Sequence, residues 1–334
     1  MKAIAPGKLI LSGEHAVVYG RPALAMAIDR SAVAEIEPLA GCQVTFDLAD
    51  LSASSSFTER ALRDFKERIQ KNYREFLEGR MSIRDVVRKP IELFEYAFIM
   101  ILDGMHLKLD QGLGVRLRSS IPMGCGMGSS AASILSMLRA TGHYFRVDFR
   151  PDWYYSYSLE AENLQHGHAS GVDSYISLHG GCAVFQQGHA ERVPLPQGTH
   201  LLVDTGRPET GTGETVEAVR KHWQHESIWS DFEAVTRGMT DAVRRNDKGA
   251  LAATIKENHR LLTRIGVVPE KVQKFIADVE SAGCAAKICG AGASSGDAAG
   301  IVYVTSDAPV DELVKTYGYK GLTVRGEPLG VRVV

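Results

Sequence analysis

The sequence predicts an α+β fold built as two packed domains, and three observations lead to this prediction. The chain has 334 residues, which exceeds what one compact core usually supports. Hydrophobic residues make up 44% of the chain, which is enough to fill two cores. Amphipathic helices occur together with short strands in an arrangement that favours helices packed against a mixed or antiparallel sheet.

The first sixty residues are predicted to form mainly strands. Two strand-like runs, 2–5 and 9–11, are separated by Pro6-Gly7, which interrupts regular structure. Further strands are predicted at 24–28, 33–36 and 44–46. The serine-rich segment 52–56 is predicted to be a mobile loop.

Helical periodicity begins at residue 58. Between 58 and 77, apolar residues recur at three- and four-residue steps among many charges, which is typical of an amphipathic helix. A second helix is predicted over 86–105, with Pro90 near its start and Gly104 near its end. The alternation of apolar and polar residues over 114–119 then predicts a strand.

A glycine-rich loop over 122–132 joins that strand to a helix. Gly124, Gly126 and Gly128 lack the β-carbons that would keep a ligand away from the backbone, and serines follow where the helix begins. The unpaired N–H groups of a helix start favour an anion, most simply a phosphate. The alternative is a tight turn with Ser129 as the N-cap. The spacing matches neither a Walker A loop nor a dinucleotide-binding loop.

Two acids follow in the next helical region, 151–166. Glu162 shares a helix face with Tyr155 and Leu159, and a carboxylate on an inward face needs a partner or a cation. Asp173 lies in a second small-residue loop, 166–174, where it either caps the segment 175–178 or serves chemistry. The three histidines at 166, 168 and 179 suggest a zinc site as an alternative, but histidines at this spacing are more often ordinary loop residues.

The second half of the chain is predicted to start after Gln187-Gly188. It contains a third glycine loop, 290–297, between strands at 285–289 and 301–304. The other predicted elements are a strand at 182–185 before the boundary, a strand at 201–203, a loop at 204–213, helices at 214–222, 231–244, 248–264, 270–281 and 309–315, and strands at 322–324 and 331–333.

The bulk composition excludes several classes of function. The formal charge is −2, with lysine and arginine spread along the chain, so we expect neither nucleic acid nor an anionic membrane as a partner. The longest apolar run, 97–102, is far shorter than a membrane span. Five cysteines show no metal-ligand spacing, which favours a reducing compartment. We therefore expect a cytoplasmic protein whose partners are small molecules or copies of itself.

Several motifs together resemble those of the GHMP small-molecule kinases. The stretch 5–20, APGKLILSGEHAVVYG, is similar to the first family motif in its mevalonate kinase form. Galactokinase-like members would follow Glu14-His15 with Thr-Asp, whereas this chain has Ala16-Val17. The loop 122–132 is similar to the second motif, and 166–173 to the stretch that carries the catalytic acid. The resemblance covers nearly the whole chain in the expected order.

This resemblance implies a fold and an activity. It implies an N-terminal domain of the ribosomal-protein-S5-like α+β type over 1–188 and a ferredoxin-like α+β domain over 189–334. ATP would bind between them, and its γ-phosphoryl group would pass to the primary hydroxyl of (R)-mevalonate in isoprenoid precursor synthesis. A homodimer is a family-level expectation.

The resemblance also implies roles for individual residues. Asp173 would accept or orient the proton of the substrate hydroxyl, and Lys8 would pair with Asp173 near the transferred phosphate. The implied ATP contacts are Pro122, Gly124, Cys125, Gly126, Met127, Gly128, Ser129, Ser130 and Ala131. The implied Mg²⁺ ligands are Ser130 and Glu162, and the implied substrate contacts are Glu14, His15, Gly292 and Ala293.

The third loop departs from the family pattern. Mevalonate kinases usually continue this loop with more glycines, whereas this chain has Ala293-Ser294-Ser295-Gly296-Asp297. An aspartate beside a phosphate is repulsive unless a cation or an outward orientation relieves it. The alternatives are therefore a kinase for phosphomevalonate or a sugar, or a ligand sensor without turnover. A nicotinamide-dependent oxidoreductase is not expected, because the spacing of the glycines does not match a dinucleotide-binding loop.

Overall fold

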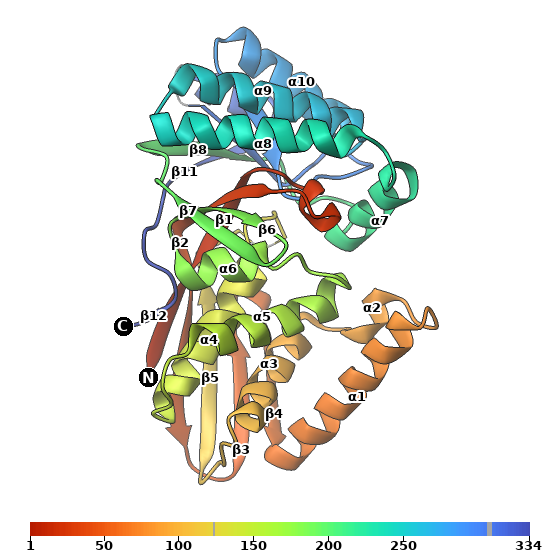
Figure 1. Ribbon diagram of the computed structural model, residues 1–334. Coiled ribbons are helices and arrows are strands. Elements are labelled where there is room, and N and C mark those ends of the chain that lie inside the picture. The colour runs from red at the N-terminus through yellow and green to blue at the C-terminus, as the bar shows by residue number, and fades with distance from the viewer. Residues whose placement is uncertain (123, 306–308) are drawn as a thin grey trace.

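The computed structural model describes residues 1–122, 124–305 and 309–334. These residues form two sheets with helices packed against them (Figure 1). Met123, which belongs to the predicted phosphate loop, lies outside the described residues. The predicted α+β class is confirmed.

The larger sheet has eight strands. Its main path runs β12-β1-β2-β5-β3-β4, with β6 paired to β2 and β7 paired to β6. Its strands are β1 (Lys2–Ser12), β2 (Ala23–Leu39), β3 (Gln43–Leu48), β4 (Ala53–Thr58), β5 (Gly112–Ser119), β6 (Cys182–Gln186), β7 (His189–Val193) and β12 (Arg332–Val333). The β3–β5 pair is parallel and β1–β2 is antiparallel.

Two local predictions in this sheet are wrong. Pro6-Gly7 does not separate two strands, because β1 continues through a register shift at this point, where a bulge tolerates proline. The segment 52–56, predicted as a mobile loop, lies mostly in β4, which pairs with β3 in a hairpin. Backbone pairing with β3 outweighs the turn preference of serine.

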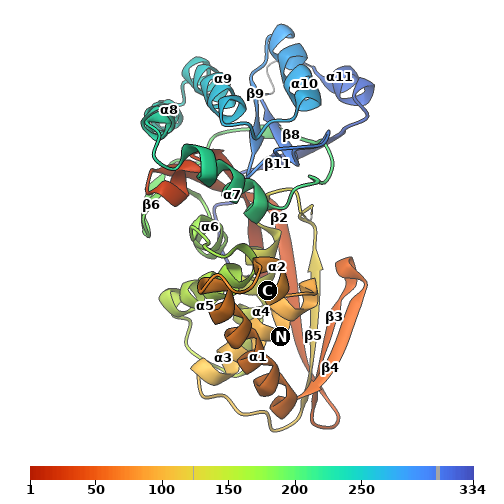
Figure 2. The same cartoon turned by 90° about the vertical axis from the view of Figure 1, so that its right-hand side faces the viewer.

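Helices from the first 180 residues cover one face of the larger sheet (Figure 2). They are α1 (Glu59–Leu77), α2 (Ile83–Val86), α3 (Pro90–Gly104), α4 (Ser129–Tyr144), α5 (Pro151–His166) and α6 (Val172–His179), with 3-10 turns η1 (Ala16–Tyr19) and η2 (Ala49–Leu51). Thr58 caps α1 by accepting the Ala61 N–H over 3.3 Å, and Pro90 opens α3 as predicted.

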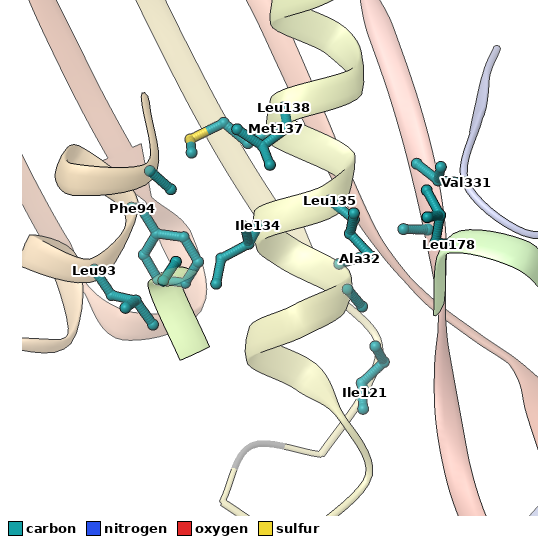
Figure 3. Packing of buried hydrophobic residues seen from close by; sticks show 14 of the residues in the cluster. Ala32, Leu93, Phe94, Ile121, Ile134, Leu135, Met137, Leu138, Leu178 and Val331 are labelled. Carbon is teal, nitrogen blue, oxygen red and sulfur yellow. The ribbon is translucent and has the colours of Figure 1, made fainter. Parts of the chain in front are cut away.

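Helix α4 lies at the centre of this core. Figure 3 shows Ile134 facing Phe94 of α3, while Leu135 lies on the side of Leu178 and Val331. All five side chains belong to one buried cluster. Packing on both sides therefore fixes the position of α4, whose first turn follows the glycine loop.

A smaller, four-stranded sheet has the order β11-β8-β10-β9. Figure 1 shows α8, α9 and α10 lying over this sheet. The elements are β8 (Thr199–Asp204), α7 (Thr212–Trp223), α8 (Ile228–Arg245), α9 (Lys248–Arg264), α10 (Glu270–Ser281), β9 (Ala286–Cys289), β10 (Ile301–Val304), α11 (Asp311–Thr316) and β11 (Lys320–Arg325). No helix of the described residues has both the length and the apolarity needed to cross a bilayer.

Buried polar contacts join the two sheets' helices and strands. The Ser12 hydroxyl at the end of β1 lies 2.7 Å from the Thr236 hydroxyl of α8 and accepts a hydrogen bond of 2.8 Å from Asn258 Nδ2 of α9. The expected domain boundary at 188/189 falls in the turn between β6 and β7, and both β7 and β12 pair within the larger sheet. A division at this point therefore stays a proposal.

Candidate active site

Lys8 and Asp173 form an ion pair beside the glycine loop. The backbone N–H of Lys8 donates to the Met127 carbonyl oxygen over 2.9 Å. Asp173 lies in the first turn of α6, whose N-cap is Gly171, so the interpretation of Asp173 as an N-cap is wrong. Lys8 Nζ is 3.0 Å from Asp173 Oδ1, with 4% and 31% of the two side chains exposed. A buried cation thus faces a carboxylate that a ligand can reach.

Glu162 is the second acid of the site. It accepts a hydrogen bond from the Ser130 hydroxyl at the start of α4. Burial, and after it the Asp173 carboxylate, raise the pKa of Glu162 to about 7, while the Ser130 hydrogen bond and Lys8 act in the opposite direction. Two carboxylates that repel each other favour a cation between them, and hydroxyl and carboxylate oxygens are the hard ligands that Mg²⁺ prefers. Ser130 and Glu162 therefore fit a Mg²⁺ site.

The three histidines considered for zinc have different surroundings. His166 Nε2 lies 3.8 Å from Glu162 Oε2, and burial lowers the pKa of His166. The His168 ring lies 6.3 Å from the Phe76 ring, and His179 ends α6. The described residues contain no group of three or more His, Cys, Asp or Glu side chains that could hold a metal ion. The geometry gives the zinc alternative no support.

The glycine loop connects β5 to α4 with left-handed backbone angles. The φ values of Gly124, Gly126 and Gly128 are 72°, 78° and 69°. Gly128 is the N-cap of α4, so the alternative in which Ser129 caps the helix is wrong. The predicted ATP contacts Pro122, Gly124, Cys125, Gly126, Met127 and Gly128 lie in this loop, and Ser129, Ser130 and Ala131 form the first turn of α4. The N–H groups of that turn are available to an anion.

Close packing is a second reason for these glycines. A Cβ at Gly126 would lie 3.0 Å from the Cys289 carbonyl oxygen, and one at Gly128 would lie 2.7 Å from Lys8 Cγ. The missing β-carbons therefore make room for protein atoms, from the end of β9 and from Lys8, and they also leave the loop backbone accessible to a ligand. The sequence pattern alone suggested only that the glycines leave the backbone accessible to a ligand.

Glu14 forms a buried ion pair with Lys287 of β9. The two side chains are 1% and 0% exposed, and Lys287 Nζ donates to Glu14 Oε1. Burial raises the pKa of Glu14, and Lys287 opposes that effect. Within the described residues, Glu14 Oε2 has no hydrogen-bond partner. No motif marks Lys287 in the sequence, although a single lysine inside the otherwise apolar strand 285–289 is a signal for a buried ion pair.

His15 reaches the third glycine loop. Its Nε2 lies 2.9 Å from the Ala291 carbonyl oxygen, and its buried Nδ1 has no hydrogen-bond partner in the described part of the chain. Gly292 and Ala293, the other implied substrate contacts, pack against Val267: the Ala293 N–H donates to the Val267 carbonyl oxygen over 3.0 Å. The structure thus brings His15 to the loop, and direct substrate contacts of Gly292 and Ala293 stay predictions.

Asp297, in the third glycine loop, faces solvent. Its side chain is 81% exposed, and its Oδ2 lies 4.0 Å from Lys271 Nζ. Both conditions that relieve repulsion between an aspartate and a phosphate, outward orientation and a nearby cation, are therefore met.

The buried His15 gives the protein a defined acid sensitivity. Burial lowers the pKa of His15 from 6.5 to about 4. The imidazole therefore binds a proton more tightly in the unfolded chain than in the folded one. The free energy of unfolding falls as the pH drops from 6.5 to about 4, and above pH 6.5 this group has no effect on it. We expect His15 to lower the free energy of unfolding by about 3 kcal/mol between pH 7 and pH 4. Guanidinium unfolding at both pH values should show a smaller decrease for His15→Gln, and an equal decrease would contradict this expectation.

Comparisons with known proteins agree with the geometry. Residues 92–181 match the family described as GHMP kinases N terminal domain. The mevalonate kinases of Thermococcus sibiricus and Pyrococcus furiosus are 28% and 29% identical to this chain over 306 and 304 residues, covering 87% of this chain and 86% of each relative. The structure of Methanococcus jannaschii mevalonate kinase matches with a TM-score of 0.80 at 22% identity, over 98% of both chains. These matches confirm the resemblance and the fold stated above.

Proposed function

We propose that this chain, whose residues 92–181 carry a GHMP kinase N-terminal domain, is a kinase that transfers the γ-phosphoryl group of ATP to the primary hydroxyl of (R)-mevalonate. The observation that carries the proposal is the Lys8–Asp173 ion pair, held against the glycine loop by the hydrogen bond from Lys8 to Met127. The similarity to archaeal mevalonate kinases over 87% of the chain supports the choice of acceptor.

The site residues have distinct tasks in this reaction. ATP would supply the phosphoryl group, and Mg²⁺ held by Ser130 and Glu162 would neutralise charge on the phosphate oxygens. Asp173 orients the acceptor hydroxyl and takes its proton as the O–P bond to the acceptor forms and the bond from the γ-phosphorus to the leaving ADP oxygen breaks. The Lys8 ammonium balances the charge of Asp173 and stabilises the charge that develops on the transferred group.

The acceptor end of the proposed site lies at Glu14 and His15. Glu14 Oε2 and His15 Nδ1 are buried and lack hydrogen-bond partners in the described residues, which costs free energy. A polyhydroxylated acid such as mevalonate offers hydroxyl groups that would satisfy both atoms. This match supports their assignment as substrate contacts.

Three further properties belong to the proposal. The chain is divided into domains at 1–188 and 189–334, it acts in the cytoplasm, and it forms a homodimer. The first is based on the order of the predicted elements, the second on the sequence composition, and the third on the family resemblance.

Turnover with a panel of acceptors tests the proposed function. ADP release from Mg-ATP is measured with mevalonate, phosphomevalonate, galactose and homoserine offered separately, and a reaction without acceptor gives the background. We expect ADP above background with mevalonate only. Turnover with another acceptor would identify that alcohol, instead of mevalonate, as the substrate. ATP binding without any turnover would favour the alternative of a ligand sensor.

A further inference from the structure

Arg207 lies beside the glycine loop, although it belongs to the segment that follows β8 of the smaller sheet. It is exposed and follows β8 in the loop that leads to α7. A Cβ at Gly124 would lie 3.7 Å from Arg207 Nε and 3.9 Å from Arg207 Cδ. The arginine side chain therefore lies where a side chain at position 124 would touch it, beside a position that carries no side chain of its own.

The segment that carries Arg207 is held in place by hydrogen bonds. The Thr205 N–H and hydroxyl donate to the Gly300 carbonyl oxygen over 2.9 and 2.8 Å, and the Thr205 hydroxyl accepts from the Ala299 N–H over 2.9 Å. Asp204 Oδ1 accepts the Gly206 N–H over 2.9 Å. The backbone that leads into Arg207 is therefore fixed relative to the residues just before β10.

The helix that follows the Arg207 segment, α7, contacts a helix packed on the larger sheet. Glu214, in the first turn of α7, forms an ion pair with Arg84 of α2. Figure 2 shows α7 extending from the smaller sheet toward α2 and α6. The connection that carries Arg207 therefore bridges from the smaller sheet to the helices around the glycine loop.

The charge of Arg207 lies near the loop, where it acts on the Cys125 thiol. Within the described residues, no carboxylate lies within ion-pair distance of its guanidinium, whereas Lys8 is paired with Asp173. Asp204 Oδ1 lies 3.8 Å from Cys125 Sγ of the loop. Burial and Asp204 raise the pKa of the Cys125 thiol to about 11, and Arg207 opposes them.

We propose that Arg207 is an additional phosphate-binding residue, which reaches across to the glycine loop and contacts the β- or γ-phosphate of the bound nucleotide. A guanidinium offers planar, paired donors that match phosphate oxygens, and an exposed arginine without a carboxylate partner can turn to them at little cost. The inference rests on nucleotide binding at the glycine loop, as in the proposed function, and is independent of which alcohol accepts the phosphoryl group.

Nucleotide titrations without acceptor test this role on the full chain. Calorimetric affinities for AMP, ADP and ATP are compared for the wild type, Arg207→Gln and Arg207→Lys in the presence of Mg²⁺. The control is Arg260→Gln, which removes the same charge from an exposed arginine of α9 that pairs with Glu257. We expect Arg207→Gln to weaken ATP or ADP binding by about 10- to 100-fold. AMP binding should be unchanged, Arg207→Lys should retain part of the affinity, and the control should match the wild type.

Two results would overturn the inference. Equal losses for all three nucleotides would mean that Arg207 only shapes the loop, and unchanged ATP and ADP affinities would mean that it stays in solvent. Because no acceptor is present, these results do not depend on the acceptor assignment. Tight ATP binding without phosphorylation of any alcohol would refute the proposed function and leave the role of Arg207 intact.

Discussion

Asp173→Asn is expected to lower kcat by about 10²–10⁴-fold while ATP binding is retained. Asparagine keeps the size of the side chain and can still accept a hydrogen bond from Lys8, which lies 3.0 Å from Asp173 Oδ1. It cannot take the proton of the acceptor hydroxyl. Steady-state kinetics with mevalonate, together with the affinity for ATP measured separately, should show a loss confined to turnover.

Asp152→Asn is a matched control for this variant. Asp152 is the second residue of α5, as Asp173 is the second residue of α6, so both changes remove the same interaction with a helix N-terminus. Asp152 is exposed. We expect wild-type turnover from the control. If Asp173→Asn also turned over at a near-normal rate, the role assigned to this acid would be wrong.

Lys287→Met is expected to lower the free energy of unfolding by about 3–5 kcal/mol, because it leaves the Glu14 carboxylate buried without its cation. Lys287 and Glu14 are 0% and 1% exposed, so water cannot take over the interaction. Denaturant unfolding at pH 7 measures the loss. The double variant Lys287→Met, Glu14→Gln removes both charges and should recover much of the stability.

The exposed pair Lys274 and Glu270 provides the comparison. It joins residues four apart on α10, and both side chains are largely in solvent. Lys274→Met removes the same functional group and is expected to leave the free energy of unfolding nearly unchanged, because solvent screens the pair. Equal effects of Lys274→Met and Lys287→Met would show that the buried pair does not stabilise the fold.

Some local predictions failed because a neighbouring strand or a backbone angle outweighed residue preference. The serines of 53–58 form a strand because β3 supplies backbone partners along its whole length. Serine and aspartate are preferred N-caps, yet α4 and α6 start from Gly128 and Gly171, at φ values of 69° and 86°. Glycine adopts such angles at little cost, and the first-turn N–H groups then stay available to a ligand.

The candidate site was partly accessible from the sequence. The family resemblance suggested that Lys8 and Asp173 meet and that Ser130 lies near Glu162, and the structure brings both pairs together. Neither Lys287 nor Arg207 was identified. Each acts on a residue of a distant segment, and neither lies in a motif whose spacing indicates its partner.

The sequence by itself determined the α+β class, the positions of the long helices and the three glycine loops. These features follow from hydrophobic periodicity and from glycine, which act between residues close together in the chain. Only the tertiary structure decided that Lys287 neutralises Glu14, 273 positions away, and that Arg207 lies over Gly124. Such pairings depend on how α4 and the smaller sheet pack, and sequence patterns between neighbouring residues do not indicate that packing.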